Sequence, residues 1–229
     1  VTVVKLDLQR PADQQPGGVD LIVFGSFANN AAPYGQYVKT HGKSLQSFVA
    51  GGGVVLEMTQ SDQLGNTVAY LPEGIKAVRG DRDLNLGYPI APGHPIIAAW
   101  LGDDAGRLDQ MQLGRKIVNW ESIDQWEGMK VLLASEPSGG SPCLLEAAHG
   151  KGRFLVSGLW VDKCYDSAGS PTASEHAVRH GQAFFAAVTR YTALVKRGEA
   201  PVVKPTPMPV EPPTGPMVGH TDTARSRIW

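Results

Sequence analysis

The sequence of 229 residues has little excess charge and few cysteines. Its formal net charge is −1 and no strong cluster of lysines and arginines stands out, so a nucleic-acid-binding protein is not expected. The two cysteines, Cys143 and Cys164, are too few for a disulfide-rich miniprotein. They are compatible with one disulfide or with two free thiols, and alone they do not indicate a compartment.

Long hydrophobic runs are also missing. No stretch approaches 18 consecutive apolar residues, so the sequence predicts no membrane span. The first residues contain neither an initiator Met nor a basic segment followed by an apolar one. A start at Val1 is expected of a processed protein or of a fragment, and the sequence leaves both open.

Three common catalytic signatures are absent. Neither GxxxxGK[ST] nor GxGxxG occurs, so a phosphate-binding loop is not predicted. His176 and His180 are four residues apart but enclose no glutamate, which breaks the HExxH zinc signature and favours a solvated pair. No serine or cysteine lies between glycines at a strand-to-helix turn, where a nucleophile elbow places it. We therefore expect no metal ion and no cofactor.

The composition is that of a globular protein, with one abrupt change. Hydrophobic residues make up 42% of the chain and charged residues 19%, as in a folded domain with its own core. Residues 201–216 then contain seven prolines, which fix φ and remove backbone donors. The sequence thus predicts an α/β domain at 1–200, a proline-rich linker at 201–216, and the start of a further module or a tail at 217–229.

Within 1–200, apolar runs of strand length alternate with helical patterns, which is typical of a parallel sheet covered by helices. The run at 20–24 ends in a Gly-Ser turn and predicts a central strand buried on both faces. Gly150 and Gly152 predict a turn with positive φ between the last two strands. The expected strands lie at 1–6, 20–24, 54–58, 75–78, 129–134, 143–148 and 153–159.

Two segments have the apolar spacing of amphipathic helices. The first spans 34–49, and the glycines at 51–53 predict a left-handed helix end. The second spans 172–195, where Thr172 and Glu175 have the spacing of a capping box. We expect this second helix to pack across the sheet and close the domain.

Polar side chains follow the carboxyl ends of the expected strands, where open parallel sheets bind ligands. The set combines hydroxyls, amides, acids and one aromatic ring, which suits hydrogen bonding to a neutral polyol or sugar. The same residue types also form turns and helix caps, and the sequence leaves that interpretation open. The candidate ligand-binding residues are Ser26, Asn29, Asn30, Thr59, Gln60, Asp62, Trp160 and Asp162.

The order of the segments DLIVFGS, FVAGGGVVLEM, GHPII and GKGRFLVSGLWVD resembles the class I glutamine amidotransferase-like superfamily. Across residues 15–195 the chain is most similar to the ThuA-like (trehalose utilisation) branch. Members of that branch similarly carry a His-Pro-Ile segment before a short helix and a Gly-Lys-Gly-Arg turn before a late strand. The resemblance implies a flavodoxin-like three-layer α/β sandwich with a mostly parallel central sheet.

The chain departs from this family at the residues that carry amidotransferase chemistry. The family places a cysteine after the third strand and a His-Glu pair near the end. Here the corresponding positions are 59–61, Thr-Gln-Ser, and 159–162, Leu-Trp-Val-Asp. Of the Gly-His-Asp that the ThuA-like branch often shows, only Asp162 is kept. The Cys-His-Glu triad is absent, so a glutaminase is not expected.

The last residues, 215–229, resemble the start of the N-terminal β-sandwich module of PhoD-like alkaline phosphatases. This resemblance implies that the chain is the front part of a larger phosphoesterase-type protein that is periplasmic or secreted. We accordingly expect a non-catalytic accessory domain. Its partner would be a small polar or carbohydrate ligand, or the downstream domain of the same polypeptide.

Two other functions remain open. A hydrolase would use the loop from Thr59 to Asp62, and would need a base within hydrogen-bond reach of its nucleophile, or a metal ion. A purely structural domain would pack against the downstream module or form oligomers through Trp100, Trp120 or Trp126. Burial of these tryptophans in the core of the domain itself would count against the structural role.

Overall fold

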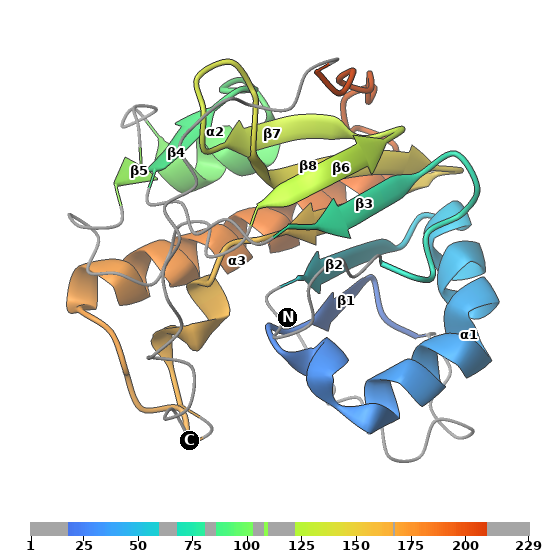
Figure 1. The fold of residues 1–229 in the computed structure, drawn as a ribbon, viewed down its shortest axis with the longest axis horizontal. Helices are drawn as coiled ribbons and strands as arrows, with labels where there is room; N and C mark the ends of the chain where they lie inside the picture. The colour runs from blue at the N-terminus through green and yellow to red at the C-terminus, as the bar shows by residue number, and fades with distance from the viewer. Residues whose placement is uncertain are drawn as a thin grey trace.

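The computed structural model of the chain describes residues 18–59, 68–80, 86–102, 108–109, 122–166 and 168–209. The predicted strand at 1–6 and the predicted module start at 217–229 lie outside these ranges. The described residues form an α/β fold with a large mixed β-sheet, a small two-stranded sheet and α-helices (Figure 1).

The large sheet is parallel on one side and antiparallel on the other. The strands β1, β2 and β9 run parallel, whereas β9, β8, β7, β4 and β5 pair antiparallel in that order. The sheet is therefore mixed, where the sequence predicted a mostly parallel one. The connections from β7 to β8 and from β8 to β9 are short, and a short turn joins only antiparallel neighbours. In sheet order the strands are β1 (Leu21–Phe24), β2 (Val54–Met58), β9 (Gly152–Ser157), β8 (Pro142–His149), β7 (Lys130–Ala134), β4 (Leu86–Pro89) and β5 (Leu108–Asp109).

Strand β1 is the edge strand of the described sheet, and the prediction of a central strand buried on both faces is wrong. Ile22 and Phe24 are buried, but the side chain of Val23 between them is 41% exposed.

The strand predicted at 75–78 is also placed differently from the prediction, because it does not belong to the large sheet. As β3 (Lys76–Arg79) it leaves the large sheet and pairs antiparallel with β6 (Ile123–Glu127).

Helices cover both faces of the parallel part of the sheet. The alternation of side chains along β2 sends Leu56 toward α2 (Pro95–Leu101) and α3 (Glu175–Arg197), and Val55 toward α1 (Ala32–Ala50). Figure 1 shows α3 passing behind the sheet and α1 beside β1 and β2. The predicted helices at 34–49 and 172–195 are thus both present, and the later one packs across the sheet as expected.

The start of α3 differs from the prediction. Its N-cap is Ser174, whose hydroxyl accepts a hydrogen bond from the Ala177 backbone N–H at 3.2 Å. Thr172 instead donates its hydroxyl to the Lys163 carbonyl oxygen at 2.7 Å. The predicted capping box is therefore wrong, because Thr172 is held by the turn before the helix.

The turn between β8 and β9 lies against the end of α1. Gly150 has φ of +57°, as predicted, and a Cβ there would come within 2.6 Å of the Ala50 carbonyl oxygen. Gly152 does not have positive φ. It is needed for close approach instead, since its Cβ would come within 2.1 Å of the Val49 carbonyl oxygen.

The first part of the proline-rich segment is hydrogen-bonded to the domain. Thr206 accepts at its hydroxyl from the Val131 N–H at 3.1 Å and donates its own N–H to the Met129 carbonyl at 2.8 Å. The Trp126 indole N–H donates to the Thr206 carbonyl at 2.9 Å. Residues 201–209 form no helix or strand, and they follow the surface of the domain at least as far as Thr206.

Two of the three candidate interface tryptophans are buried within the domain. Trp100 is 5% and Trp126 is 6% exposed, and each indole N–H donates to a backbone carbonyl of the same chain. This burial counts against oligomer formation through these two side chains. Trp120 lies outside the described residues. Cys143 and Cys164 are both buried and form no disulfide with each other.

Candidate functional site

A cavity of about 480 Å³ opens at the carboxyl ends of β1 and β2, where the sequence places its candidate ligand site. We call it the Glu57 cavity. Its walls come from the short helix η2 (Ala28–Asn30), the first half of α1, the end of β2, the residues 68–70 and the end of β3. The described lining residues are Asn29, Tyr34, Gly35, Val38, Lys39, Gly42, Lys43, Gln46, Glu57, Thr59, Val68, Ala69, Tyr70 and Arg79.

Glu57 is a buried acid at the wall of this cavity. It stands on the same face of β2 as Val55, so its carboxyl group points toward α1. The Tyr34 hydroxyl donates to Oε1 at 3.0 Å and the Tyr70 hydroxyl donates to Oε2 at 2.8 Å. Burial raises the pKa of Glu57 to about 8, against the two tyrosine hydrogen bonds, which lower it. Near neutral pH the carboxyl group is therefore mostly protonated.

The tyrosines stay protonated throughout the physiological range. Burial and the neighbouring Glu57 carboxylate raise the pKa of both Tyr34 and Tyr70 well above the ordinary phenol value. Gln46 holds the second tyrosine in place by donating its side-chain amide to the Tyr70 carbonyl at 3.0 Å. The result is a hydrogen-bonded group of an acid and two phenols at the wall of the cavity.

Two of the residues proposed from the sequence line this cavity. Asn29 belongs to η2, and its Oδ1 is buried without a hydrogen-bond donor among the described residues. Thr59 follows β2, and its hydroxyl donates to the Ser157 carbonyl at 3.2 Å. That bond joins the ends of β2 and β9, so the Thr59 hydroxyl already has a partner.

Two other proposed residues bind each other instead of lining the cavity. Asp162, on the short helix η3 (Val161–Cys164), accepts the Ser26 N–H at 2.8 Å and the Ser26 hydroxyl at 2.7 Å. This pair ties the end of β1 to the segment after β9. A Cβ on Gly25 would lie 3.2 Å from the same carboxylate, which shows how closely the two ends approach.

Of the four remaining proposed residues, Trp160 and Asn30 lie in the described ranges and the other two lie outside them. The Trp160 indole packs against the Phe27 ring with centroids 6.1 Å apart, and Asn30 ends η2. Neither is among the residues that line the Glu57 cavity. Gln60 and Asp62 lie outside the described residues.

The sequence analysis did not select Tyr34, Glu57, Tyr70 and Arg79 as site residues. A charged residue within the otherwise apolar run of β2 was the available signal for Glu57, because a strand buried on both faces rarely contains an acid. Tyr34 has the same helical spacing as true core residues. Arg79 and Tyr70 carry no local signal, since only the placement of β3 and the segment before it brings them to the cavity.

A second buried acid lies on the opposite face of the sheet, on a strand two positions away from the strand of Glu57. The Glu146 carboxylate on β8 meets His94 Nε2 at 3.2 Å and Arg153 Nε at 3.4 Å, and the Tyr191 hydroxyl donates to it. His94 also caps α2, because its Nδ1 accepts the Ile96 N–H at 3.2 Å. This network joins β8, β9, α2 and α3, and we interpret it as part of the core.

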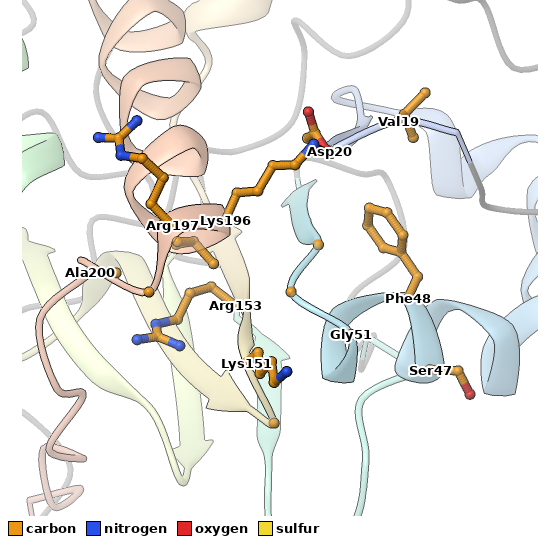
Figure 2. A pocket seen from close by; sticks show the side chains of 15 residues that line it. Val19, Asp20, Ser47, Phe48, Gly51, Lys151, Arg153, Lys196, Arg197 and Ala200 are labelled. Atoms are coloured by element: carbon orange, nitrogen blue, oxygen red, sulfur yellow. Dashed lines mark hydrogen bonds and ion pairs between the residues drawn. The ribbon is translucent and has the colours of Figure 1, made fainter.

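A second cavity, of about 690 Å³, lies at the amino ends of the parallel strands, between the last residues of α1 and of α3 (Figure 2). Three of its basic side chains already have acidic partners: Lys196 lies 2.6 Å from Asp20, Arg197 lies 2.8 Å from Glu199, and Arg153 binds Glu146. In Figure 2 the groups of Arg153, Arg197 and Lys151 point in different directions. Lys196 and Arg197 also end α3, where cations stabilise the helix dipole. These positions do not form a converging anion site.

The described residues offer little for metal-dependent or covalent chemistry. Within the described ranges, no group of three or more His, Cys, Asp or Glu residues is placed to hold a metal ion. Burial raises the pKa of the Cys143 thiol, which disfavours the nucleophilic thiolate. None of the helices in these ranges is both long and apolar enough to cross a membrane.

The comparisons with known proteins do not assign a family. No family model and no curated protein matches the chain. Among solved structures, the β-galactosidase from Rahnella sp. R3 is 17% identical with a TM-score of 0.46, over 80% of this chain and 24% of the enzyme. A cytoplasmic protein from Salmonella typhimurium is 12% identical with a TM-score of 0.44, over 82% of this chain and 76% of that one.

A third similar structure is the exo-β-1,4-mannosidase from an Opitutaceae bacterium, 12% identical with a TM-score of 0.37, over 84% of this chain and 28% of the enzyme. The chain thus spans only about a quarter of the length of either glycosidase. Likenesses of this size establish neither family nor activity. The fold and the site define the chain as an α/β domain with a polar cavity at the carboxyl ends of its parallel strands.

Proposed function

We propose that this chain is a non-catalytic domain that binds a small polar ligand, such as a carbohydrate, in the Glu57 cavity. The observation that carries the proposal is the Asn29 side chain at the cavity wall, whose buried Oδ1 has no donor among the described residues. An unsatisfied buried acceptor of this kind costs about 1–3 kcal/mol. A ligand hydroxyl in the cavity would supply the missing donor.

The surrounding groups support a ligand with several hydrogen-bonding positions. The carboxyl group of Glu57 is mostly neutral near pH 7, so it can both donate and accept, as a sugar hydroxyl does. Tyr34 and Tyr70 add aromatic surface next to it. A mixture of aromatic walls and a few fixed polar groups is typical of small-molecule sites.

The hydroxyl contacts favour binding over catalysis. Thr59 donates to a backbone carbonyl and Ser26 donates directly to Asp162, so neither has an imidazole base as its hydrogen-bond acceptor. Among the described residues that line the Glu57 cavity there is no histidine. A hydrolase that uses the loop from Thr59 to Asp62 is therefore the less favoured alternative.

The finer assignments of fold and context are part of the same proposal. We place the domain in the amidotransferase-like superfamily, in its ThuA-like branch, with a flavodoxin-like sandwich. Support comes from the helices on both faces of the parallel strands and from His94 and Pro95 at the start of α2. A downstream phosphoesterase-type module, and a periplasmic or secreted location, rest on the sequence of residues 215–229.

A cavity-filling variant tests the ligand site. Gly35 lines the cavity on α1, and a Cβ added there meets no heavy atom within 4 Å. Leucine in place of this helical glycine should fill part of the cavity without destabilising the fold, because leucine favours a helix by roughly 0.8 kcal/mol over glycine. Gln36→Leu is the matched control, since Gln36 is exposed on the same helix and does not line the cavity.

The measurement is saturation-transfer NMR of the full chain with neutral monosaccharides and polyols, glucose included. We expect transfer to at least one probe in the wild type and in Gln36→Leu, and its loss in Gly35→Leu. Transfer that persists in Gly35→Leu would move the ligand site elsewhere. Absence of transfer to every probe, charged sugars included, would overturn the proposal, and hydrolysis of a 4-nitrophenyl ester that is lost in Thr59→Ala would favour the hydrolase.

A further inference from the structure

The acid and the two phenols at the wall of the Glu57 cavity are joined by two contacts between oxygen atoms. The Tyr34 oxygen lies 3.0 Å from Glu57 Oε1, and the Tyr70 oxygen lies 2.8 Å from Oε2. All three residues line the cavity and are at most 8% exposed. Buried polar hydrogens need an acceptor, so the number of hydrogens that this group holds determines what it offers to a ligand.

That number depends on the protonation state of Glu57. Each contact between two oxygens holds one hydrogen. When Glu57 is ionised, the two phenols supply one hydrogen to each contact and the carboxylate only accepts. When Glu57 is protonated, the same two contacts have three hydrogens, so one hydrogen points away from the group. Protonation of Glu57 therefore adds one hydrogen-bond donor to the wall of the cavity.

The additional donor is a phenol. When the carboxyl O–H of Glu57 donates to one tyrosine oxygen, that tyrosine turns its own hydrogen out of the contact. Among the described residues, neither the Tyr34 nor the Tyr70 hydroxyl has a second hydrogen-bond partner. The cavity that both tyrosines line is therefore where the released hydrogen finds an acceptor.

Asn29 has the opposite requirement. Its Oδ1 lines the same cavity and is a buried acceptor without a donor among the described residues. With Glu57 protonated, the cavity wall thus has one donor and one acceptor that need partners. An alcohol hydroxyl accepts one hydrogen bond and donates another, so a single hydroxyl satisfies both groups.

We infer that a hydroxyl of the ligand bridges Asn29 and one of the two phenols, and that the Glu57 cavity binds this ligand more tightly when Glu57 is protonated. The inference rests on the proposed ligand-binding function and specifies the ligand group and the regulation of the same site. The hydroxyl accepts the phenol hydrogen and donates to Asn29 Oδ1. When Glu57 ionises, the phenol donates to the carboxylate again, and the ligand hydroxyl is left with one hydrogen for two acceptors.

Other ionisable groups also line the cavity, and a pH effect has to be separated from them. They are Tyr34 and Tyr70 at the acid itself, Lys39 and Lys43 on α1, and Arg79 at the end of β3. On the two neighbouring strands the acid is paired with Phe24 and Val156, which do not titrate. Glu57→Gln keeps all of these groups and is uncharged at every pH, so its comparison with the wild type isolates the proton of Glu57.

The test is titration of the full chain with glucose, mannose and myo-inositol at pH 7 and at pH 9. Dissociation constants come from the methyl chemical shifts of Val38 and Val68, which line the cavity, and the methyl spectrum also shows whether the chain is folded at each pH. Losing one hydrogen bond to a buried group weakens binding about tenfold. Because the pKa of Glu57 is about 8, we expect at least one probe to bind about fivefold more weakly at pH 9 than at pH 7.

Two variants assign the effect to Glu57. In Glu57→Gln the amide supplies a hydrogen at every pH, so the affinities at pH 7 and pH 9 should differ by less than about twofold. Glu73→Gln is the matched control, because Glu73 is exposed and does not line the cavity. It should keep the fivefold difference of the wild type.

A second measurement needs no variant. The carboxyl carbon of Glu57 is followed by ¹³C NMR of the wild type during a pH titration, without a probe and with the tightest-binding probe near saturation. Binding and protonation are linked reciprocally, so the probe should raise the titration midpoint of Glu57 by up to about one pH unit. An unchanged midpoint would overturn the inference.

The outcomes separate the inference from the proposed function. Equal wild-type affinity at pH 7 and pH 9 would overturn the role of the Glu57 proton and leave the ligand-binding domain intact. A weaker affinity at pH 9 that persists in Glu57→Gln would also overturn the inference, because another group would then carry the titration. No methyl shift at Val38 or Val68 with any of the three probes, at either pH, would overturn the ligand site in this cavity and the inference with it.

Discussion

Replacing Glu57 with glutamine measures how strongly the fold favours the protonated acid. Glutamine has the same shape and, like the protonated acid, one acceptor oxygen and a donor group for Tyr34 and Tyr70. It carries no charge at any pH. The difference in stability between the two proteins therefore reports the ionisation of Glu57 alone, because all other titrating groups are shared.

The sign follows from the direction of the pKa shift. The pKa of Glu57 is raised from 4.5 to about 8 by burial, so the folded protein holds this proton more tightly than the unfolded chain. The stabilisation is fully present below about pH 4.5 and is lost as the pH rises through about 8. At roughly 1.36 kcal/mol per pKa unit, the full range corresponds to an upper bound of about 5 kcal/mol.

The assay is urea unfolding of the wild type and Glu57→Gln at several values between about pH 5 and pH 8. We expect similar free energies of unfolding at the acidic end and a variant more stable by several kcal/mol at the alkaline end. Glu73→Gln, which removes an exposed carboxylate, controls for the loss of a charge. A difference between wild type and Glu57→Gln that stays constant over this pH range would refute the reasoning.

Two further predictions concern the core network and the proline-rich segment. Glu146→Ala should lower the free energy of unfolding by about 3–5 kcal/mol, because it leaves the Arg153 charge buried without its acid; a loss below about 1 kcal/mol in urea unfolding would contradict the network's structural role. Thr206→Val should cost about 1–3 kcal/mol and speed hydrogen exchange at the Val131 amide, which loses its acceptor. Unchanged exchange at that amide would mean that the Thr206 hydroxyl does not protect the Val131 N–H of β7.

Local patterns predicted the elements better than their arrangement. The two long helices, the strand Val54–Met58 and the Gly150 turn depend on spacing and on glycine conformation, which neighbouring residues determine. The edge position of β1 and the departure of β3 to a separate sheet depend on pairing between distant segments. No local pattern specifies which strands become neighbours, and this is why a mostly parallel sheet was expected.

The site was predicted in position but only partly in composition. The carboxyl ends of β1 and β2 do carry a cavity, and Asn29 and Thr59 line it. Ser26 and Asp162 are better explained by each other, because the hydroxyl after β1 and the carboxylate after β9 form a structural hydrogen bond. Glu57 was missed because the segment 54–58 was interpreted only as a strand, and the acid within it was not considered as a site residue.

The proline-rich segment shows a further limit of composition. Prolines predicted a linker at 201–216, and its described part, residues 201–209, forms no helix or strand. The three hydrogen bonds of Thr206 to Trp126, Met129 and Val131 are tertiary contacts that composition does not encode. The lack of helix or strand in this segment therefore does not mean that it is detached from the domain.

A crystal structure of the chain with the neutral sugar or polyol that binds it tests the central claim most directly. The account predicts ligand in the Glu57 cavity, with a hydroxyl donating to Asn29 Oδ1. Ligand in the cavity beside Gly51 to Gly53, or a Glu57 cavity left empty at a saturating concentration of that ligand, would contradict it.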